Sequence, residues 1–281
     1  MTDGSPPDSG WFEGVSPDSP EETAATVRDG SAQTVRSWPE LAVESGFSDS
    51  KAEYYDALHE ATMAATRASV REAETADDKQ LIHAVRAMDD CERVANELAE
   101  RLAEWAGTRR EDAGTGVTYA KSLAAEDADG ADAGLVSLAR RIRDLDEETA
   151  SLRAHVERTA PEIAPNLSTL AGPVLAARLI ALAGGLKALA RKPAGTVQVL
   201  GAEEALFAHL RGHAPSPKHG VIFVHEAIQG TAPEHRGSAA RALSGKLAIA
   251  ARVDHYSGEK KPELARELDE RIERIQERDS G

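Results

Sequence analysis

The stretch LVSLARRIRDLDEETASLRAHV, residues 135–156, places an apolar or small side chain at alternating steps of three and four residues. Alternating steps of three and four form the heptad seam of a coiled-coil helix. The stretch therefore predicts a long helix with one buried edge, and its seam positions are Leu135, Leu138, Ile142, Leu145, Thr149, Leu152 and Val156.

A second seam of similar length lies upstream, with one irregular step, at Leu81, Val85, Met88, Cys91, Ala95, Leu98, Leu102 and Trp105. Gly107 follows its last apolar position and marks a helix stop. Loop-like residues 107–134 join the two seams, which predicts an antiparallel helical hairpin within residues 50–160. Two alternatives remain for the hairpin: it protrudes as an arm that binds a partner, or its two seams only cover each other. If the partner is a second copy of the chain, the side chains of the dimer coiled coil are Leu81, Val85, Met88, Leu98, Leu102, Leu138, Ile142, Leu145 and Leu152.

The segments on either side of the hairpin differ in composition. Residues 1–49 form a short acidic N-terminal segment, and its first 30 residues are rich in Ser, Pro, Gly and Asp, which predicts that they are largely disordered. Within them WFEGV, residues 11–15, is an apolar island suited to docking a partner. Residues 161–279 are the most apolar third, and Pro161 and Pro165 are expected to break the second long helix there.

Composition places the chain in the mainly α class. Hydrophobic residues make up 41% of its 281 residues but aromatic residues only 4%, which favours helices packed through small side chains. No window of 18 uncharged apolar residues is present, so no membrane partner is expected. The acidic N-terminus has no apolar signal core, and we expect a cytoplasmic protein. The single cysteine, Cys91, excludes a disulfide framework.

The formal net charge is −15, with 24 arginines against 9 lysines. Residues 1–160 hold 17 basic and 34 acidic side chains, whereas residues 161–281 hold 16 and 14. A large acidic excess repels itself unless salt screens it. The balance therefore suggests a halophilic source with a very salty cytosol.

A search for catalytic or metal-binding patterns finds none that is complete. His209 and His213 are four residues apart, but Gly212 and Pro215 break their helix. HEAIQ, residues 225–229, has glutamine where a zinc protease needs its second histidine. GTGVTY, residues 114–119, lacks the third glycine of a dinucleotide loop. We therefore expect no enzyme activity, no cofactor and no metal.

One basic helix stands out in this acidic chain: PEHRGSAARALSGKLAIAARVD, residues 233–254. Arg241, Gly245, Ala248 and Arg252 share one face at steps of 4, 3 and 4. Two interpretations remain open. A phosphate backbone lies against this small-residue strip between the two arginines, or another helix packs against it and the arginines face solvent.

Three segments in consistent order resemble the Nop domain, and with their flanks they span about residues 160–279. They are AARLIALAGGLKALARKPAGTVQVLGAEEALFAHL, then PKHGVIFVHEAI, then RGSAARALSGKLAIAARVDHYSG. The upstream stretch KQLIHAVRAMDDCERVANELAERLAEWAG is similar to the first coiled-coil helix of the same family. The chain thus resembles the Nop family, the fibrillarin partner in archaeal and eukaryotic box C/D ribonucleoproteins.

The resemblance implies an all-helical Nop domain, with residues 220–225 extended and buried, and a non-catalytic scaffold. Its expected partners are box C/D guide RNA, a kink-turn-binding protein, fibrillarin and a second copy of the chain. Fibrillarin would perform the ribose 2′-O-methylation. Lys218 and the arginines would hold phosphates, and His219 would stack or hydrogen-bond near an exposed base. The residues expected to contact RNA or its particle are Lys187, Gln198, Lys218, His219, Arg236, Arg241, Lys246 and Arg252.

The chain departs from the family pattern in three ways. Only about 50 residues precede the coiled coil, where the family commonly has an α/β domain, so fibrillarin docking is expected to move to WFEGV and the first helix. Glu204 stands where the family commonly has lysine, and Ala208 where it often has arginine. A lysine-rich tail is absent. High salt weakens phosphate attraction, so recognition would shift toward shape, stacking and hydrogen bonds.

The sequence also bears on three other functions. A spliceosomal Nop-domain protein would share the same signature, and a coiled-coil dimer without an RNA role would need only the seams. A methyltransferase is disfavoured because no glycine-rich cofactor loop follows a strand.

Overall fold

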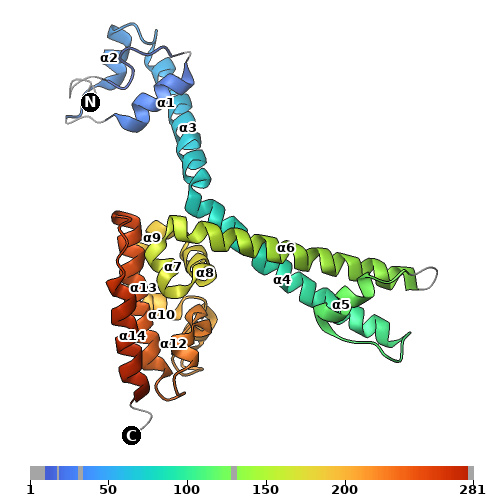
Figure 1. Cartoon of the computed structure of the whole chain (residues 1–281). Helices are drawn as coiled ribbons and strands as arrows, with labels where there is room; N and C mark the ends of the chain where they lie inside the picture. The colour runs from blue at the N-terminus through green and yellow to red at the C-terminus, as the bar shows by residue number, and fades with distance from the viewer. Residues whose placement is uncertain (1–9, 18, 31–33, 128–131, 278–281) are drawn as a thin grey trace. The chain divides into compact units, whose positions relative to one another are not determined.

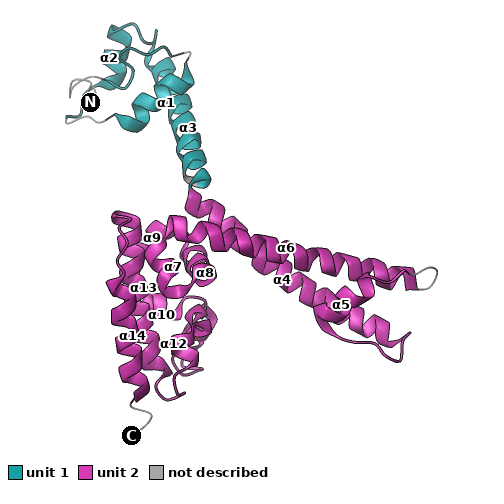
Figure 2. Ribbon diagram, in the orientation of Figure 1, with its two compact units in different colours: residues 1–76 teal, residues 77–281 magenta. Residues whose placement is uncertain are grey.

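The structure is a computed structural model that describes residues 10–17, 19–30, 34–127 and 132–277 (Figure 1). These residues form helices and no β-strand, which confirms the mainly α class. The chain divides into two compact units, residues 1–76 and residues 77–281 (Figure 2). The first unit extends past the predicted boundary at residue 49, because the helix that begins at Lys51 packs on the preceding segment.

The N-terminal unit contains α1 (Pro20–Asp29), α2 (Trp38–Glu44) and α3 (Lys51–Thr75). Ser50 caps α3 by accepting a hydrogen bond from the amide of Glu53 at 3.2 Å. Aromatic side chains form its core: Phe12 is only 3% exposed, and the Trp11 indole N–H donates to the Tyr54 hydroxyl at 3.1 Å. The structure thus differs from the expected disorder at residues 10–17 and 19–29; residues 1–9 lie outside the described part.

The hairpin of the second unit consists of α4 (Asp77–Gly107) and α6 (Ala133–Ile163), which lie side by side (Figure 1). The seam side chains fill its interior within a single chain. Leu81, Val85, Met88, Leu102 and Ile142 are at most 1% exposed, and four more are half-buried in the same cores: Leu98, Leu138, Leu145 and Leu152. The structure therefore favours seams that cover each other within one chain.

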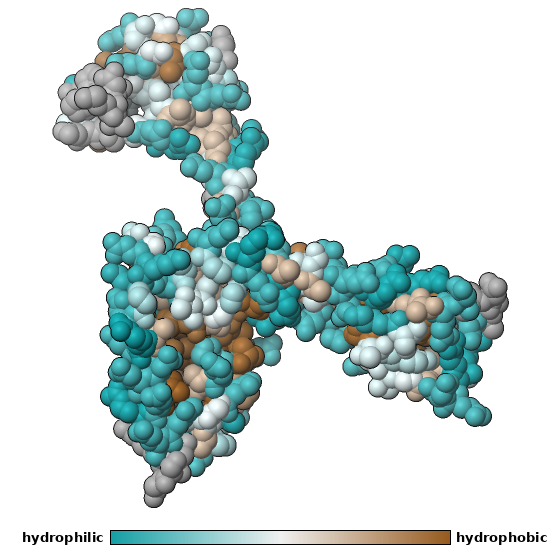
Figure 3. All heavy atoms as spheres, viewed as in Figure 1, coloured by the Kyte–Doolittle hydropathy of each residue, from teal (hydrophilic) through white to brown (hydrophobic). Residues whose placement is uncertain are grey.

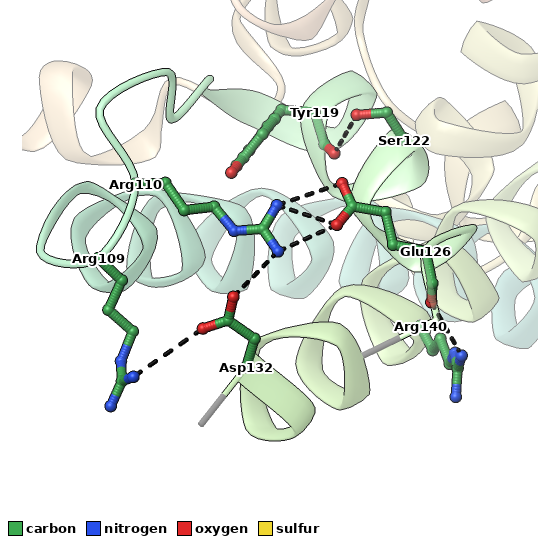
Figure 4. Close-up of polar contacts among 7 residues, drawn as sticks. All are labelled: Arg109, Arg110, Tyr119, Ser122, Glu126, Asp132 and Arg140. Atoms are coloured by element: carbon green, nitrogen blue, oxygen red, sulfur yellow. Dashed lines mark hydrogen bonds and ion pairs between the residues drawn. The ribbon is translucent and has the colours of Figure 1, made fainter. Parts of the chain in front are cut away.

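A short helix, α5 (Gly116–Ala124), packs on both arms near the tip of the hairpin. Arg110 holds this region together by donating three hydrogen bonds to the Glu126 carboxylate, at 3.0, 3.0 and 3.2 Å, and one to Asp132 at 3.3 Å (Figure 4). Arg140 adds a hydrogen bond to the carbonyl of Glu126 at 3.2 Å. The hydrogen bonds from Arg110 to Glu126 raise the pKa of the Arg110 guanidinium, so it stays charged.

The sequence predicts that the second long helix breaks at Pro161, but α6 continues to Ile163. Proline has no N–H, so α6 lacks one backbone hydrogen bond at this position, and the helix ends two residues later. Pro165 then starts a new helix at its first turn, where proline has no donor to lose.

The remaining helices form a bundle around the long helix α13 (Arg236–Tyr256). Ala239, Leu243, Leu247 and Ala250 of this helix are fully buried. The segment expected to be extended, residues 220–225, instead contains the 3-10 helix η2 (Val221–Val224), with Ile222 buried. The helices that pack against α13 are α7 (Pro165–Ala171), α9 (Leu186–Ala190), α10 (Ala194–Val199), α12 (Glu226–Gln229) and α14 (Glu263–Gln276). Helix α8 (Pro173–Ala183) packs on α4, α6 and α7, and α11 (Glu203–Leu210) follows α10 along the chain.

Among the described residues, no single helix is long and apolar enough to cross a membrane. Helices α7 and α8 meet that criterion only as a pair, and the pair is bent by 116° at the break between them.

Candidate nucleic-acid interface

The loop PKHG, residues 217–220, is held in place by Gln198 of α10. The Gln198 side-chain amide donates to the carbonyl of Lys218 at 2.7 Å, and the Gln198 carbonyl accepts from the amide of Gly220 at 2.9 Å. Gly220 is needed for this close approach, because a Cβ atom there would lie 1.9 Å from the carbonyl oxygen of Leu200. The loop therefore presents Lys218 and His219 in a fixed position, and the hydrogen bonds of Gln198 hold the loop there.

Two side chains from different segments meet at Phe223 of η2. The His219 ring stacks on the Phe223 ring at a centroid distance of 4.4 Å and an interplanar angle of 19°. The Arg236 guanidinium carbon lies 5.6 Å from the same ring centroid, within the range of a cation–π contact. Arg236 also donates to the carbonyl of Thr231 at 3.1 Å. Imidazole, phenyl and guanidinium groups are thus brought into one cluster.

The charges of this cluster act on His219. Burial lowers the pKa of His219 below its usual value, and the positive charges of Arg236 and Lys218 lower it further. At neutral pH the ring is therefore neutral. A neutral, half-buried imidazole stacked on a phenyl ring is suited to stacking on a nucleic-acid base.

Lys218 lies beside the N-terminal end of α13. Its Cδ is 3.9 Å from where a Cβ on Gly237 would lie, so its alkyl chain passes close to the helix start. Lys218 is exposed, and the helix dipole adds to the positive potential there. The amides of Arg236, Ser238 and Ala239 already donate to Ala232 and His235 carbonyls. A phosphate would therefore be held mainly by the side-chain charges of Lys218 and Arg236. We call Lys218, His219, Phe223 and Arg236 the basic–aromatic cluster.

The other predicted contact residues lie apart from the basic–aromatic cluster. Lys246 forms an ion pair with Glu267 of α14, and its side chain is only 21% exposed. Arg252 donates to the carbonyls of Ala190 and Lys192 at 3.1 and 3.2 Å, and so caps the end of α9. Lys187 is exposed on α9 and Arg241 is exposed in the middle of α13.

The strip between Arg241 and Arg252 is covered toward its Arg252 end but open at Gly245, where an added Cβ would meet no atom within 4 Å. Ala248, in the middle of the strip, is 1% exposed, and the guanidinium of Arg252 bonds the end of α9. Helix α9 packs against α13. The small residues are therefore used, at least at this end, for close helix packing, which is the second of the two interpretations.

Phe223 and the exposed face of α11 were not predicted as part of a site. No residue of α11 is buried, and Phe207 and Leu210 are 59% and 71% exposed. Val224 is 53% exposed as well. Figure 3 shows further apolar surface on this bundle, around the region labelled α8 and α12 in Figure 1. The sequence signal that could have marked this face is ALFAHL, which places apolar side chains on a short helix.

The fold and the cluster define an all-helical domain that presents basic and aromatic side chains on one surface, as nucleic-acid-binding domains do. Comparisons with known proteins agree. Residues 133–277, about half of the chain, match the family model described as Nop, snoRNA binding domain, fibrillarin. The chain belongs to the Nop family.

Individual relatives resemble different shares of the chain. An uncharacterized NOP5 family protein of Methanocaldococcus jannaschii is 50% identical over 141 residues, which are 50% of this chain and 34% of that protein. The probable nucleolar protein 5-2 of Arabidopsis thaliana is 33% identical over 215 residues, 63% of this chain and 40% of that protein. The chain thus spans between a third and two fifths of the length of these relatives.

A solved structure covers more of the chain. A chain from the crystal structure of a fibrillarin/Nop5p complex matches 95% of this chain and 98% of its own length, with a TM-score of 0.54 and 26% sequence identity.

Proposed function

We propose that this protein is a non-catalytic scaffold of a box C/D guide ribonucleoprotein, which holds guide RNA through its Nop domain. The basic–aromatic cluster is the observation that carries the proposal. Lys218 and Arg236 supply charge for phosphates, and the neutral His219 ring supplies a stacking surface for a base. Family membership supplies the class of RNA.

The exposed side chains of α11 and η2 support a second contact, with a kink-turn-binding protein. Phe207, Leu210 and Val224 are apolar and exposed, whereas Glu203 and Glu204 make the start of α11 acidic. This surface suits a protein partner better than RNA, because it combines apolar area with negative charge. The Nop domain would then bind the RNA and the kink-turn-binding protein together, as one composite surface.

Fibrillarin would be the methyltransferase of the particle, and we propose that it docks on the N-terminal unit. WFEGV does not serve as a free docking segment, because Phe12 is buried and Trp11 packs against Phe47 and Tyr54. Exposed apolar side chains on α3 remain available for docking, with Tyr55 at 58% and Met63 at 40%.

Reconstitution tests this function. The full chain, a kink-turn-binding protein, fibrillarin, a box C/D guide RNA and S-adenosylmethionine should together methylate a guide-paired RNA at a ribose 2′-hydroxyl. Omission of this chain should abolish site-specific methylation, and the chain without fibrillarin should show none. Methylation that proceeds equally without this chain would overturn the proposal.

A further inference from the structure

A second basic surface lies at the other end of α13 from the basic–aromatic cluster. It is a pocket of about 490 Å³ between the start of α4, the α9 segment and the last turn of α13. Its charged and polar side chains come from three elements that are distant in sequence: Asp78, Lys79, Lys187, Arg191 and His255. Of these residues, Lys187 alone is among the RNA contacts expected from the sequence.

The pocket is built on a fixed turn. Gly184 and Gly185 both have positive φ values, 88° and 137°, which side chains rarely allow. The carboxylate of Asp78 accepts from the amide of Leu186 at 2.9 Å, and Lys79 donates to the carbonyl of Gly184 at 3.1 Å. These contacts tie α4 to the turn before α9, so the basic side chains project from a rigid base.

The lining of the pocket keeps a net positive charge. It holds Lys79, Lys187 and Arg191 against one acidic residue, Asp78. Across the described part of the chain, no carboxylate lies within ion-pair distance of Lys187 or Arg191. Arg252, which bonds the carbonyls of Ala190 and Lys192, adds a further positive charge to the end of α9.

Such a concentration of positive charge is unusual in a chain whose net charge is −15. Elsewhere in the described hairpin most arginines pair with carboxylates, as Arg93 does with Asp90 and Glu97. An unpaired group of cations in a pocket attracts a polyanion, because each neutralised phosphate releases a counterion.

Aromatic groups adjoin these cations. The ring of His255 lines the pocket, and the Tyr256 ring lies 4.6 Å from it at an interplanar angle of 61°. Tyr256 is 69% exposed, so one of its faces can receive a base. Cations next to exposed aromatic rings are the combination that binds single-stranded nucleic acid.

We propose that this pocket binds the phosphates of a single-stranded RNA segment that flanks the structured RNA held by the basic–aromatic cluster. The inference rests on the proposed function. Arg236 and His255 are 19 residues apart on one helix, or about 29 Å at 1.5 Å per residue. The two surfaces would thus hold one RNA at both ends of α13, with Lys187 and Arg191 on phosphates and Tyr256 on a base.

Two RNA probes test the proposal with the full chain and a kink-turn-binding protein. One is a kink-turn RNA without extensions, and the other carries single-stranded extensions at both ends. The double variant Lys187→Gln/Arg191→Gln should bind the first probe as the wild type does. It should bind the extended probe more weakly, with a slope of log affinity against log salt shallower by about 1.4, the value for two lost single-strand contacts.

The matched control, Lys260→Gln/Arg266→Gln, removes the same number of positive charges outside the pocket. It should bind both probes as the wild type does. If extensions add no affinity to the wild type, or if the double variant and the control behave alike, the pocket does not bind RNA while the proposed function stands. If the wild type binds neither probe, the proposed function fails together with the inference.

Discussion

The carboxylate of Asp254, in the last turn of α13, accepts hydrogen bonds from both the backbone amide and the side-chain amide of Asn166, at 3.0 and 2.6 Å. The same carboxylate accepts from the amide of Leu167 at 2.8 Å. Asn166 also donates to the carbonyl of Glu259 at 2.7 Å and accepts from the amide of Lys261. One buried network therefore joins α7, α13 and the turn before α14.

Asp254→Ala should destabilise the second unit strongly, because it leaves the amides of Asn166 and Leu167 buried without an acceptor. We expect a loss of about 3 kcal/mol in the free energy of unfolding, measured by chemical denaturation. Asp269→Ala, at an exposed position of α14, is the matched control and should change it by less than about 0.5 kcal/mol. Equal effects of the two variants would contradict a stabilising role for the network.

Gly245→Ala separates the two interpretations of the small-residue strip on α13. A Cβ at Gly245 meets no atom within 4 Å, so alanine should fit and stabilise the helix by up to about 1 kcal/mol. RNA affinity should not change, because the strip is not the RNA contact in this account. A variant that is stable but binds RNA several-fold more weakly would show that a phosphate backbone does approach Gly245.

The lowered pKa of His219 predicts a dependence of stability on pH. As the pH falls, the unfolded chain takes up this proton first, near pH 6.5, and the folded chain takes it up later. The stability that the neutral ring contributes is therefore complete above about pH 6.5 and is lost as the pH falls through the lower, folded-state pKa.

The free energy of unfolding should accordingly fall less between about pH 7.5 and 5 in His219→Gln than in the wild type. His213→Gln, at an exposed histidine of the same unit, should retain the full dependence. An identical pH profile for the wild type and both variants would rule out this role of His219.

Salt should stabilise the protein. With 48 acidic against 33 basic side chains, the folded chain repels itself, and added salt screens that repulsion. We expect the thermal midpoint to rise by several degrees between low and molar KCl, measured by circular dichroism. A midpoint that stays constant or falls across that range would contradict the inferred adaptation to a salty cytosol.

The parts of the fold that could be predicted are those that depend on local sequence patterns. The hairpin follows from side chains repeated along one helix edge, as at Leu135 and Ile142, which the two arms and α5 bury together. The N-terminal unit was missed because its core depends on long-range contacts such as Trp11 with Tyr54, which composition does not reveal.

The basic–aromatic cluster also depends on long-range contacts, which the sequence does not reveal. Lys218, His219 and Arg236 were expected at a site, but Phe223, which brings His219 and Arg236 together, was expected only as part of a buried segment. Nor does residue spacing distinguish a contact arginine from a capping one. Arg252 differs from Arg241 only because the end of α9 lies beside it.

The most direct test measures the affinity of a kink-turn RNA, bound to its kink-turn protein, for the wild type and for Arg236→Gln by fluorescence anisotropy across a salt series. Circular dichroism confirms that each variant is folded, and Arg266→Gln, exposed on α14, is the matched control. Loss of the Arg236 charge should weaken binding about tenfold, equivalent to about 1.4 kcal/mol, and make the salt slope shallower by about 0.7–0.9. The control should match the wild type. A folded Arg236→Gln protein with unchanged affinity and slope would contradict the claim that the basic–aromatic cluster holds RNA.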